Sequence, residues 1–131
     1  MSPEKPKLLK MIKRFDRVDI ATSDLAEAVS TYQRNFDFTV RWAANSDEAT
    51  IELGDSQIRL RAGAAVSDLI SSSGEGLAAV WLETDDVQRA AEKLKNANIA
   101  VSPIRVEGNR RILAVDPASA NMVPLFIFQR L

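Results

Sequence analysis

Two stretches of the chain, residues 17–38 and 79–99, carry the same order of apolar and polar positions. In each stretch apolar residues first alternate with other residues, and after a Thr and an Asp they recur every three or four positions. Alternation predicts a strand with one buried face, and the wider spacing predicts an amphipathic helix. The matching residues lie 62 positions apart, Val18, Thr22 and Asp24 corresponding to Val80, Thr84 and Asp86. A repeat of half the chain predicts a pseudo-symmetric pair of modules.

The first repeat and the residues after it predict one β-α-β-β-β module. The expected elements are strands at 15–22, 38–42, 49–53 and 57–61 and a helix at about 24–35. Thr22 or Ser23 is expected to cap the helix, because both side chains can accept a hydrogen bond from its first turn. The turn Gly54-Asp55-Ser56 closes a hairpin between the last two strands.

The second half repeats this plan. The expected elements are strands at 77–84, 100–103, 111–115 and 122–129 and a helix at 86–96. The last strand is apolar on both faces, which predicts that both are buried, and Pro124 indicates an edge position or a bulge. Arg110 and Arg111 are interpreted as the edge of a strand, with no functional role.

Residues 62–76 lie between the modules and combine weak periodicity with many Ser and Gly residues. This composition predicts a connection without regular structure. Two interpretations stay open, a plain linker and a mobile flap over a binding site, because long loops in compact domains are often functional.

The length of 131 residues predicts one domain. We expect a basic N-terminal arm at 1–14 and a single domain at 15–131, with module one at 15–62, the connection at 63–76 and module two at 77–131.

Charge and composition narrow the function. A net charge of −1 gives no electrostatic case for binding nucleic acid or a membrane. The chain has no Cys and no His, so it lacks a thiolate nucleophile, an imidazole base and any soft metal ligand. We therefore expect no metal and no cofactor, and the absence of Cys favours a cytoplasmic protein.

Three motifs in this order resemble the vicinal-oxygen-chelate superfamily, which includes glyoxalase I, methylmalonyl-CoA epimerase, extradiol dioxygenases and the bleomycin- and fosfomycin-resistance proteins. They are FDRVDIATSDLAEAVSTYQRNFDF, LETDDVQRAAEKLKNANI and AVDPASANMVPLFIF. The last is most similar to the epimerase and glyoxalase I branch. The resemblance covers residues 15–129 and implies an α+β fold in which two β-α-β-β-β modules form a curled mixed sheet around a cleft.

The resemblance also implies four positions for the ligands of a divalent metal, and these fall on Arg17, Arg59, Ala79 and Phe126. None of the four side chains is a metal ligand, and the two arginines would repel a divalent cation. We therefore expect no metal-dependent glyoxalase, epimerase or dioxygenase activity.

Strand alternation in the implied fold places nine side chains on the face of the cleft. They are Arg17, Asp19, Gln57, Arg59, Arg61, Trp81, Glu83, Phe126 and Phe128. One half of this set is charged and the other half is apolar and aromatic. We predict that the arginines bind a carboxylate or phosphate and that the rings hold an apolar or planar remainder.

Two other hypotheses stay open. In one, Arg17 and Arg59 pair with Asp19 and Glu83, the rings fill the cleft, and the protein is a structural or assembly homologue. In the other, the protein is a metal-independent lyase, isomerase or dioxygenase-like enzyme that uses Asp19, Glu83 or Glu52, although no nucleophile and base set is recognisable. A homodimer is expected, in which the modules pair within one chain or between two.

Overall fold

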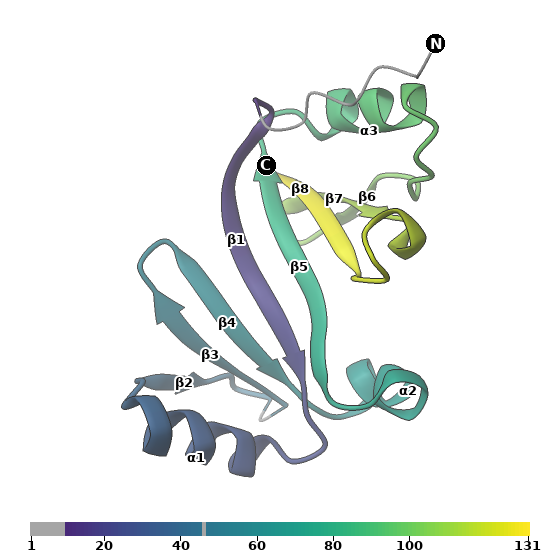
Figure 1. The fold of residues 1–131 in the computed structure, drawn as a ribbon. Coiled ribbons are helices and arrows are strands. Elements are labelled where there is room, and N and C mark those ends of the chain that lie inside the picture. Colours follow the sequence, from purple (N-terminus) through teal and green to yellow (C-terminus); the bar gives the residue numbers. More distant parts are fainter. Residues whose placement is uncertain (1–9, 46) are drawn as a thin grey trace. The chain divides into compact units, whose positions relative to one another are not determined.

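The computed structural model describes residues 10–45 and 47–131, and this part of the chain contains eight strands and three α-helices. Their order, β1-α1-β2-β3-β4, α2 and then β5-α3-β6-β7-β8, confirms an α+β fold of two β-α-β-β-β modules (Figure 1). The described residues form two compact units. Residues 17–79 are called the first unit, and residues 10–16 with 80–131 are called the second unit.

Four strands in the order β2-β3-β4-β1 make up the sheet of the first unit. β1 (Ile12–Ala21) pairs in parallel with β4 (Ser56–Arg61) through its residues 17–21. β3 (Glu48–Leu53) runs antiparallel to β4 and to the short β2 (Val40–Trp42). The unit therefore mixes parallel and antiparallel pairing, as predicted.

Helix α1 (Leu25–Phe36) covers one face of these strands. It begins after Asp24, whose carboxylate accepts a hydrogen bond from the N–H of Glu27. Asp24 is therefore the N-cap, and the predicted caps were one and two residues too early. The apolar stripe of the helix packs on inward side chains of the sheet and forms a core of Leu25, Val29, Ala49, Ile51 and Leu60.

The second unit has the corresponding order β5-β8-β7-β6. β5 (Gly76–Thr84) pairs in parallel with β8 (Leu125–Arg130), and β7 (Arg110–Val115) runs antiparallel to β8 and to β6 (Arg105–Glu107).

Helix α3 (Val87–Asn96) packs on this second set of strands, and Asp86 caps it by accepting a hydrogen bond from the N–H of Arg89. The buried core between the helix and the strands comprises Val87, Ala90, Ala91, Leu94, Leu113, Val115 and Ile127.

The two units share one strand register, as the sequence repeat predicts. Asp19 lies opposite Arg59 in the β1–β4 pair, and Trp81 lies opposite Phe126 in the β5–β8 pair. Because Asp19 and Trp81 are 62 positions apart, Arg59 and Phe126 occupy equivalent places. The same reasoning relates two further pairs, Arg61 with Phe128 and Glu48 with Ile112.

The connection between the modules contains helix α2 (Ala64–Ser73), so the prediction of a segment without regular structure was wrong. Its Val66, Leu69 and Ile70 recur at helical spacing and pack with Ala21 and Ala78. Burial of this stripe stabilises a helix whose Ser content gives it little intrinsic propensity.

The predicted strand at 100–103 is also wrong. In this segment Val101 makes only an isolated bridge to Val115, and the second strand of the module is β6, which begins at Arg105. The alternation of apolar side chains in residues 100–103 suggested a strand, but Pro103 lacks the N–H that a ladder needs, so alternation alone did not predict the structure here.

Strand β8 begins at Leu125, after Pro124, rather than at residue 122. It lies between β5 and β7, so the edge position inferred from Pro124 is wrong. Pro124 precedes the ladder, where its missing N–H is not required, and its carbonyl accepts a hydrogen bond from the N–H of Val80. Ile127 and Phe128 are buried, whereas Phe126 is half-buried.

β1 begins at Ile12, so the end of the predicted N-terminal arm belongs to a strand, and residues 1–9 of that arm lie outside the described residues. In the part of the chain that is described, no helix is long and apolar enough to cross a membrane.

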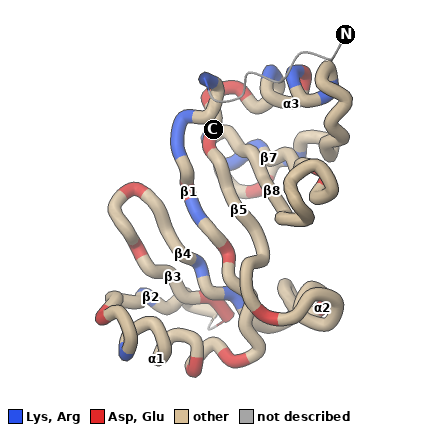
Figure 2. Tube along the Cα trace, viewed as in Figure 1, with Lys and Arg blue, Asp and Glu red and all other residues tan. Residues whose placement is uncertain are grey.

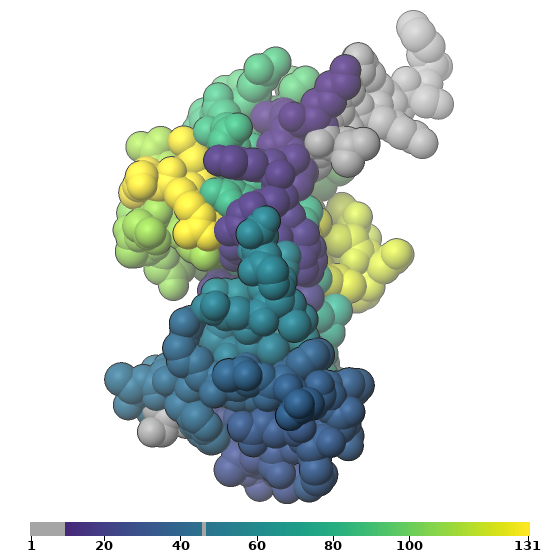
Figure 3. All heavy atoms as spheres, turned by 90° about the vertical axis from the view of Figure 1, so that its left-hand side faces the viewer, coloured from purple at the N-terminus to yellow at the C-terminus, as the bar shows by residue number. Residues whose placement is uncertain are grey.

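The outer surface of the first unit includes the segment from α1 to β2, coloured blue in Figure 3. Tyr32, Phe36 and Phe38 form a ring cluster there, with centroid separations of 5.4 to 6.4 Å. This cluster lies on the helix side of the strands and takes no part in the charged face described below.

Candidate functional site

The strand face of the first unit that points away from α1 carries a cluster of charged side chains. Alternation along β1 and β4 and the register between β3 and β4 place these residues on one face. Figure 2 shows the basic and acidic positions along β1. We call this group the first cluster: Arg17, Asp19, Glu48, Arg59 and Arg61.

Asp19 is the centre of the first cluster and is only 1% exposed. Arg59 donates to it through two parallel hydrogen bonds, from Nε to Oδ1 at 2.8 Å and from Nη2 to Oδ2 at 2.7 Å. Arg17 Nε lies 3.4 Å from Oδ1, and Arg61 Nη1 lies 3.9 Å from Oδ2. Arg61 also donates from Nε to Glu48 Oε1 at 3.2 Å. The buried carboxylate therefore fixes the orientation of the arginines around it.

The second unit has a corresponding group, the second cluster: Arg14, Asp16, Glu83, Arg110 and Arg130. Arg14 donates to Asp16 and to Glu83, both at 2.6 Å, and Arg130 donates to the same two carboxylates at 3.1 and 3.2 Å. Arg110 donates from Nη2 to Asp16 Oδ2 at 3.2 Å. Asp16 and Glu83 are each 4% exposed, so two buried carboxylates are satisfied by three guanidinium groups.

Aromatic rings adjoin the second cluster. Trp81 and Phe126 stack with centroids 4.5 Å apart, and Trp81 meets the edge of Phe128 at 6.1 Å. The Arg110 guanidinium lies 4.0 Å from the centroid of Phe128, and Arg105 lies 5.8 Å from that of Phe126. These are cation–π distances, so arginines pack on the aromatic layer as well as on the carboxylates.

The predicted site residues fall into two groups. Arg17, Asp19, Arg59 and Arg61 meet in the first unit, and Trp81, Glu83, Phe126 and Phe128 share a face in the second. The predicted pairing of Asp19 with arginines is present. Glu83, however, pairs with two other arginines, Arg14 and Arg130.

Sequence reasoning missed four members of the second cluster: Arg14, Asp16, Arg110 and Arg130. Strict alternation from Arg17 and Asp19 assigns Arg14 and Asp16 to the opposite face of β1. In the structure, Asp16 is buried among arginines, and both it and Asp19 lie in charged clusters although they are three residues apart. The interpretation of Arg110 as strand edge overlooked this role, since no signal in the sequence links it to a residue 94 positions away.

The family-type metal positions can be tested against the side chains present. Arg17 and Arg59 offer only donors, and Ala79 and Phe126 offer no ligand atom. The neighbouring carboxylate of Asp19 is bound by Arg59. In the described ranges, no group of three or more Asp or Glu side chains is arranged to hold a metal ion. These residues therefore do not fit a divalent cation.

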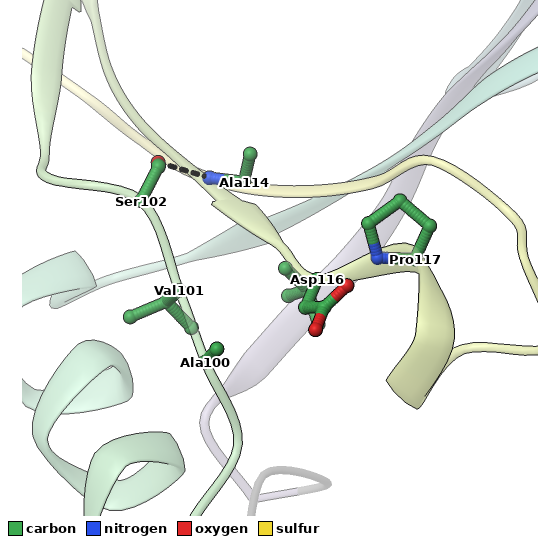
Figure 4. Close-up of a pocket in the computed structure, with 7 residues that line it drawn as sticks. Ala100, Val101, Ser102, Ala114, Asp116 and Pro117 are labelled. Carbon is green, nitrogen blue, oxygen red and sulfur yellow. Dashed lines mark hydrogen bonds between the residues drawn. The ribbon is translucent and has the colours of Figure 1, made fainter.

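Three surface pockets lie away from both clusters. One of about 230 Å³ is lined by Ala100–Ser102 and residues 114–117, where the N–H of Ala114 donates to Ser102 Oγ at 2.8 Å (Figure 4). Two others, of about 330 and 180 Å³, lie beside α2 and beside the start of α3. None of these three pockets is lined by a predicted site residue.

The structure has two β-α-β-β-β modules with one shared register, and each carries charged side chains on the face away from its helix. This arrangement defines an α+β protein of the glyoxalase type. The family model described as Glyoxalase/Bleomycin resistance protein/Dioxygenase superfamily matches residues 14–121. The chain therefore belongs to this superfamily. The comparison with curated proteins found no match.

Solved structures agree on the fold. A variant of methylmalonyl-CoA epimerase from Streptomyces coelicolor, in complex with 2-nitronate-propionyl-CoA, is 21% identical, with a TM-score of 0.71 over 91% of this chain and 95% of that one. The epimerase from Mycobacterium tuberculosis is 18% identical, with a TM-score of 0.73 over 92% and 90%. A hypothetical protein from Bacillus halodurans C-125 is 16% identical, with a TM-score of 0.75 over 90% and 94%.

Proposed function

We propose that this protein is a metal-independent member of the superfamily that binds a small organic anion, a molecule with a carboxylate or phosphate group and an apolar or aromatic part. One observation carries the proposal. In both units, three arginines converge on two carboxylates on the strand face away from the helix. Arginine forks held in this way match carboxylate and phosphate oxygens.

The first cluster supplies orientation as well as charge. Arg59 uses Nε and Nη2 for Asp19, and its side chain is 16% exposed. A guanidinium that is already fixed loses little conformational entropy when an anion binds, so such a group favours affinity. Asp19 therefore acts as a positioning residue for Arg59 in this proposal.

The second unit has an apolar surface of its own beside its charged cluster. Phe126 is half-buried and stacks on Trp81, and Arg105 lies over the Phe126 ring. A planar ring bordered by cations suits an aromatic or otherwise planar acid. Trp81 and Phe128 are buried, and the Trp81 ring contacts both Phe126 and Phe128.

The family supports this ligand class. Epimerases of the same fold bind thioesters of coenzyme A, as in the Streptomyces coelicolor complex with 2-nitronate-propionyl-CoA and in an epimerase complex with methylmalonyl-CoA and NH4+. Because the identity is near 20%, the likeness fixes the fold, and the ligand class remains our proposal.

Titration of the protein with benzoate and phenyl phosphate tests the proposal. The variant Trp42→Phe removes an exposed indole and leaves Trp81 as the only tryptophan. We expect a change in Trp81 fluorescence and a rise in Tm with at least one of these anions. Absence of both effects with either anion would overturn the proposal.

Matched arginine variants sharpen this test. Arg59→Lys keeps the positive charge but removes the fork, so we expect about tenfold weaker binding. Arg34→Lys, on the exposed surface of α1, is the control and should bind as the parent does. Equal loss in both variants would show that general surface charge, and not the first cluster, binds the anion.

A second candidate is a non-catalytic structural or assembly homologue. It is favoured by the Arg59–Asp19 pair, in which two short hydrogen bonds already occupy a carboxylate that is 1% exposed. Under this candidate no small anion raises Tm, and the predicted homodimer, measurable by analytical ultracentrifugation, is the functional form.

A metal-independent enzyme is the least supported of the three hypotheses. The buried carboxylates Asp16, Asp19 and Glu83 all accept hydrogen bonds from arginines. These hydrogen bonds hold guanidinium groups against the carboxylates, which favours the charged form of the carboxylates and makes them weaker bases.

A further inference from the structure

The pocket of about 330 Å³ beside α2 is built entirely within the first unit. One wall is the segment between β1 and α1, and the other is a stripe of α2 with its preceding glycine, in which residues recur at helical spacing. The lining residues are Thr22 and Ser23 on the first wall and Gly63, Ser67, Ile70 and Ser71 on the second. Ile70 packs on the buried core that contains Ala21, the residue before Thr22, so the two walls are held together.

Three hydroxyl groups of this lining already donate their hydrogen within the chain. The donations are from Ser67 to the carbonyl of Ala64 at 3.2 Å, from Thr22 to that of Asp24 at 3.1 Å, and from Ser23 to Glu75 Oε1 at 2.6 Å. A hydroxyl group has a single hydrogen to donate but two lone pairs that accept. What these groups still offer to a molecule in the pocket is therefore an acceptor.

Two carboxylates border the lining residues. Glu75 accepts from the N–H and Oγ of Ser23, and these bonds, the backbone N–H first, hold the pKa of Glu75 below its ordinary value of 4.5, so it is ionised at neutral pH. Asp47 lies against Gly63, where an added Cβ would be 2.9 Å from Asp47 Oδ2. The Asp47 carboxylate thus lies at the start of α2 and offsets the positive end of the helix dipole. Both charges that these contacts place beside the pocket are negative.

We propose that this pocket binds a small primary ammonium ion with a short alkyl chain. An ammonium group has three N–H donors and no acceptor, which matches hydroxyl groups whose own hydrogens are already donated. Glu75 and Asp47 favour its positive charge, and the half-buried Ile70 offers apolar surface to the chain. The site goes beyond the proposed function, because it takes a cation and is lined by no residue of either charged cluster.

The test compares butylammonium with three molecules of similar shape. 1-Butanol lacks the charge, butyrate reverses it, and butyltrimethylammonium keeps it but has no N–H donor. Each is titrated into the full chain at neutral pH and followed by proton–nitrogen NMR. We expect butylammonium at about millimolar concentrations to give saturable shifts of the amides of Ser23, Ser67 and Ser71. The other three should bind about tenfold more weakly.

Two matched pairs of variants locate the site. Glu75→Gln keeps an acceptor oxygen but removes the charge, so we expect about threefold to fivefold weaker binding. Asp68→Asn removes an exposed carboxylate of α2 that does not line the pocket, and it should bind as the parent does. Ser71→Phe should fill the pocket and abolish binding. Ser72→Phe changes the next residue, which is also exposed but outside the lining, and should leave binding intact.

The inference is overturned if butyltrimethylammonium binds as tightly as butylammonium, because N–H donors are then not recognised. Equal binding of 1-butanol or butyrate overturns it as well, since the pocket would not select a cation. Absence of saturable shifts at the three amides, or shifts that persist in Ser71→Phe, shows that the pocket is not the site. All of these results leave the proposed function intact, because that is tested with benzoate and phenyl phosphate through the fluorescence of Trp81.

Discussion

The two units use opposite chemistry at equivalent places on their strand faces. Arg59 and Arg61 on β4 of the first unit correspond to Phe126 and Phe128 on β8 of the second, and Glu48 corresponds to Ile112. The strand register and the helix packing are nevertheless the same. Residues on this face therefore do not specify the module, which is specified by the apolar face packed on the helix.

The arginines of the second cluster come from different strand positions than those of the first cluster, and they have different partners. They come from near the start of β1, the start of β7 and the end of β8, and two of them pack on the ring of Phe128. Two buried carboxylates, Asp16 and Glu83, and the ring of Phe128 therefore hold these arginines in place. In the first unit a single buried carboxylate, Asp19, holds most of the cluster. The first cluster should thus be the more fragile one.

The largest effect is expected from Asp19→Ala. It leaves Arg17, Arg59 and Arg61 without their shared, 1% exposed partner, and we expect a loss of about 3–5 kcal/mol in the free energy of unfolding, measured in urea. Asp16→Ala in the second cluster should cost less, about 1–3 kcal/mol, because Glu83 still accepts from two arginines.

The double variant Asp19→Asn with Arg59→Gln tests whether the loss in the free energy of unfolding comes from a buried unpaired charge or from lost packing. Removing both charges should cost less than removing Asp19 alone, since Arg59, which donates two hydrogen bonds to Asp19, is no longer left as a buried cation without that carboxylate. If Asp16→Ala lowers the free energy of unfolding as much as Asp19→Ala does, the first cluster is not the more fragile one.

An intermediate effect is expected from Phe128→Leu. Phe128 is fully buried and contacts Trp81 and the guanidinium of Arg110, so we expect a loss of about 1–2 kcal/mol in urea unfolding. The equivalent change in the first unit, Arg61→Leu, should cost under about 1 kcal/mol, because the Arg61–Glu48 pair is partly exposed. The reverse order would show that the charged face carries more of the stability than the aromatic one.

The smallest effect is expected from Glu75→Gln. The carboxylate of Glu75 accepts hydrogen bonds from the N–H and Oγ of Ser23, both at 2.6 Å. These bonds, the backbone N–H first, hold the pKa of Glu75 below its ordinary value of 4.5. Because the folded-state pKa is the lower one, the bonds stabilise the fold above pH 4.5, and this contribution is lost as the pH falls through the folded-state pKa.

Calorimetry across pH checks this prediction. Glu75→Gln should lower Tm slightly at neutral pH and leave it unchanged well below pH 4.5. Lys13→Gln is the matched control, because Lys13 lies 62 positions earlier and pairs with Asp85, the equivalent of Ser23, at 3.4 Å between exposed groups. A difference between parent and Glu75→Gln that persists in acid would contradict the assigned cause.

Much of the fold was predictable because its signals are local. The repeat at a spacing of 62 residues gave both helices with Asp24 and Asp86 near their starts, and the alternation gave most strands. Helix α2 was missed because its apolar stripe is short and lies among Ser residues, so its helical state depends on packing against Ala21 and Ala78. The start of β8 was misplaced because an apolar run does not show where a ladder begins.

The candidate site was likewise predictable only in the part that depends on local alternation. The charged character of Arg17, Asp19, Arg59 and Arg61 on one face follows from period-two alternation and could be stated in advance. The partners of Glu83 could not be predicted, because Arg14 and Arg130 lie 69 and 47 positions from it in the sequence.

The sequence by itself determined the repeated module, the two amphipathic helices α1 and α3, and the shared face of Arg17, Asp19, Arg59 and Arg61, since each depends on residue type and short spacing. Only the tertiary structure decided that Asp16 and Glu83 share Arg14 and Arg130, that Arg110 packs on Phe128, and that α2 is a helix. The physical reason is that a buried charge takes whichever partner the folded chain brings within hydrogen-bond distance, and local periodicity does not specify that partner.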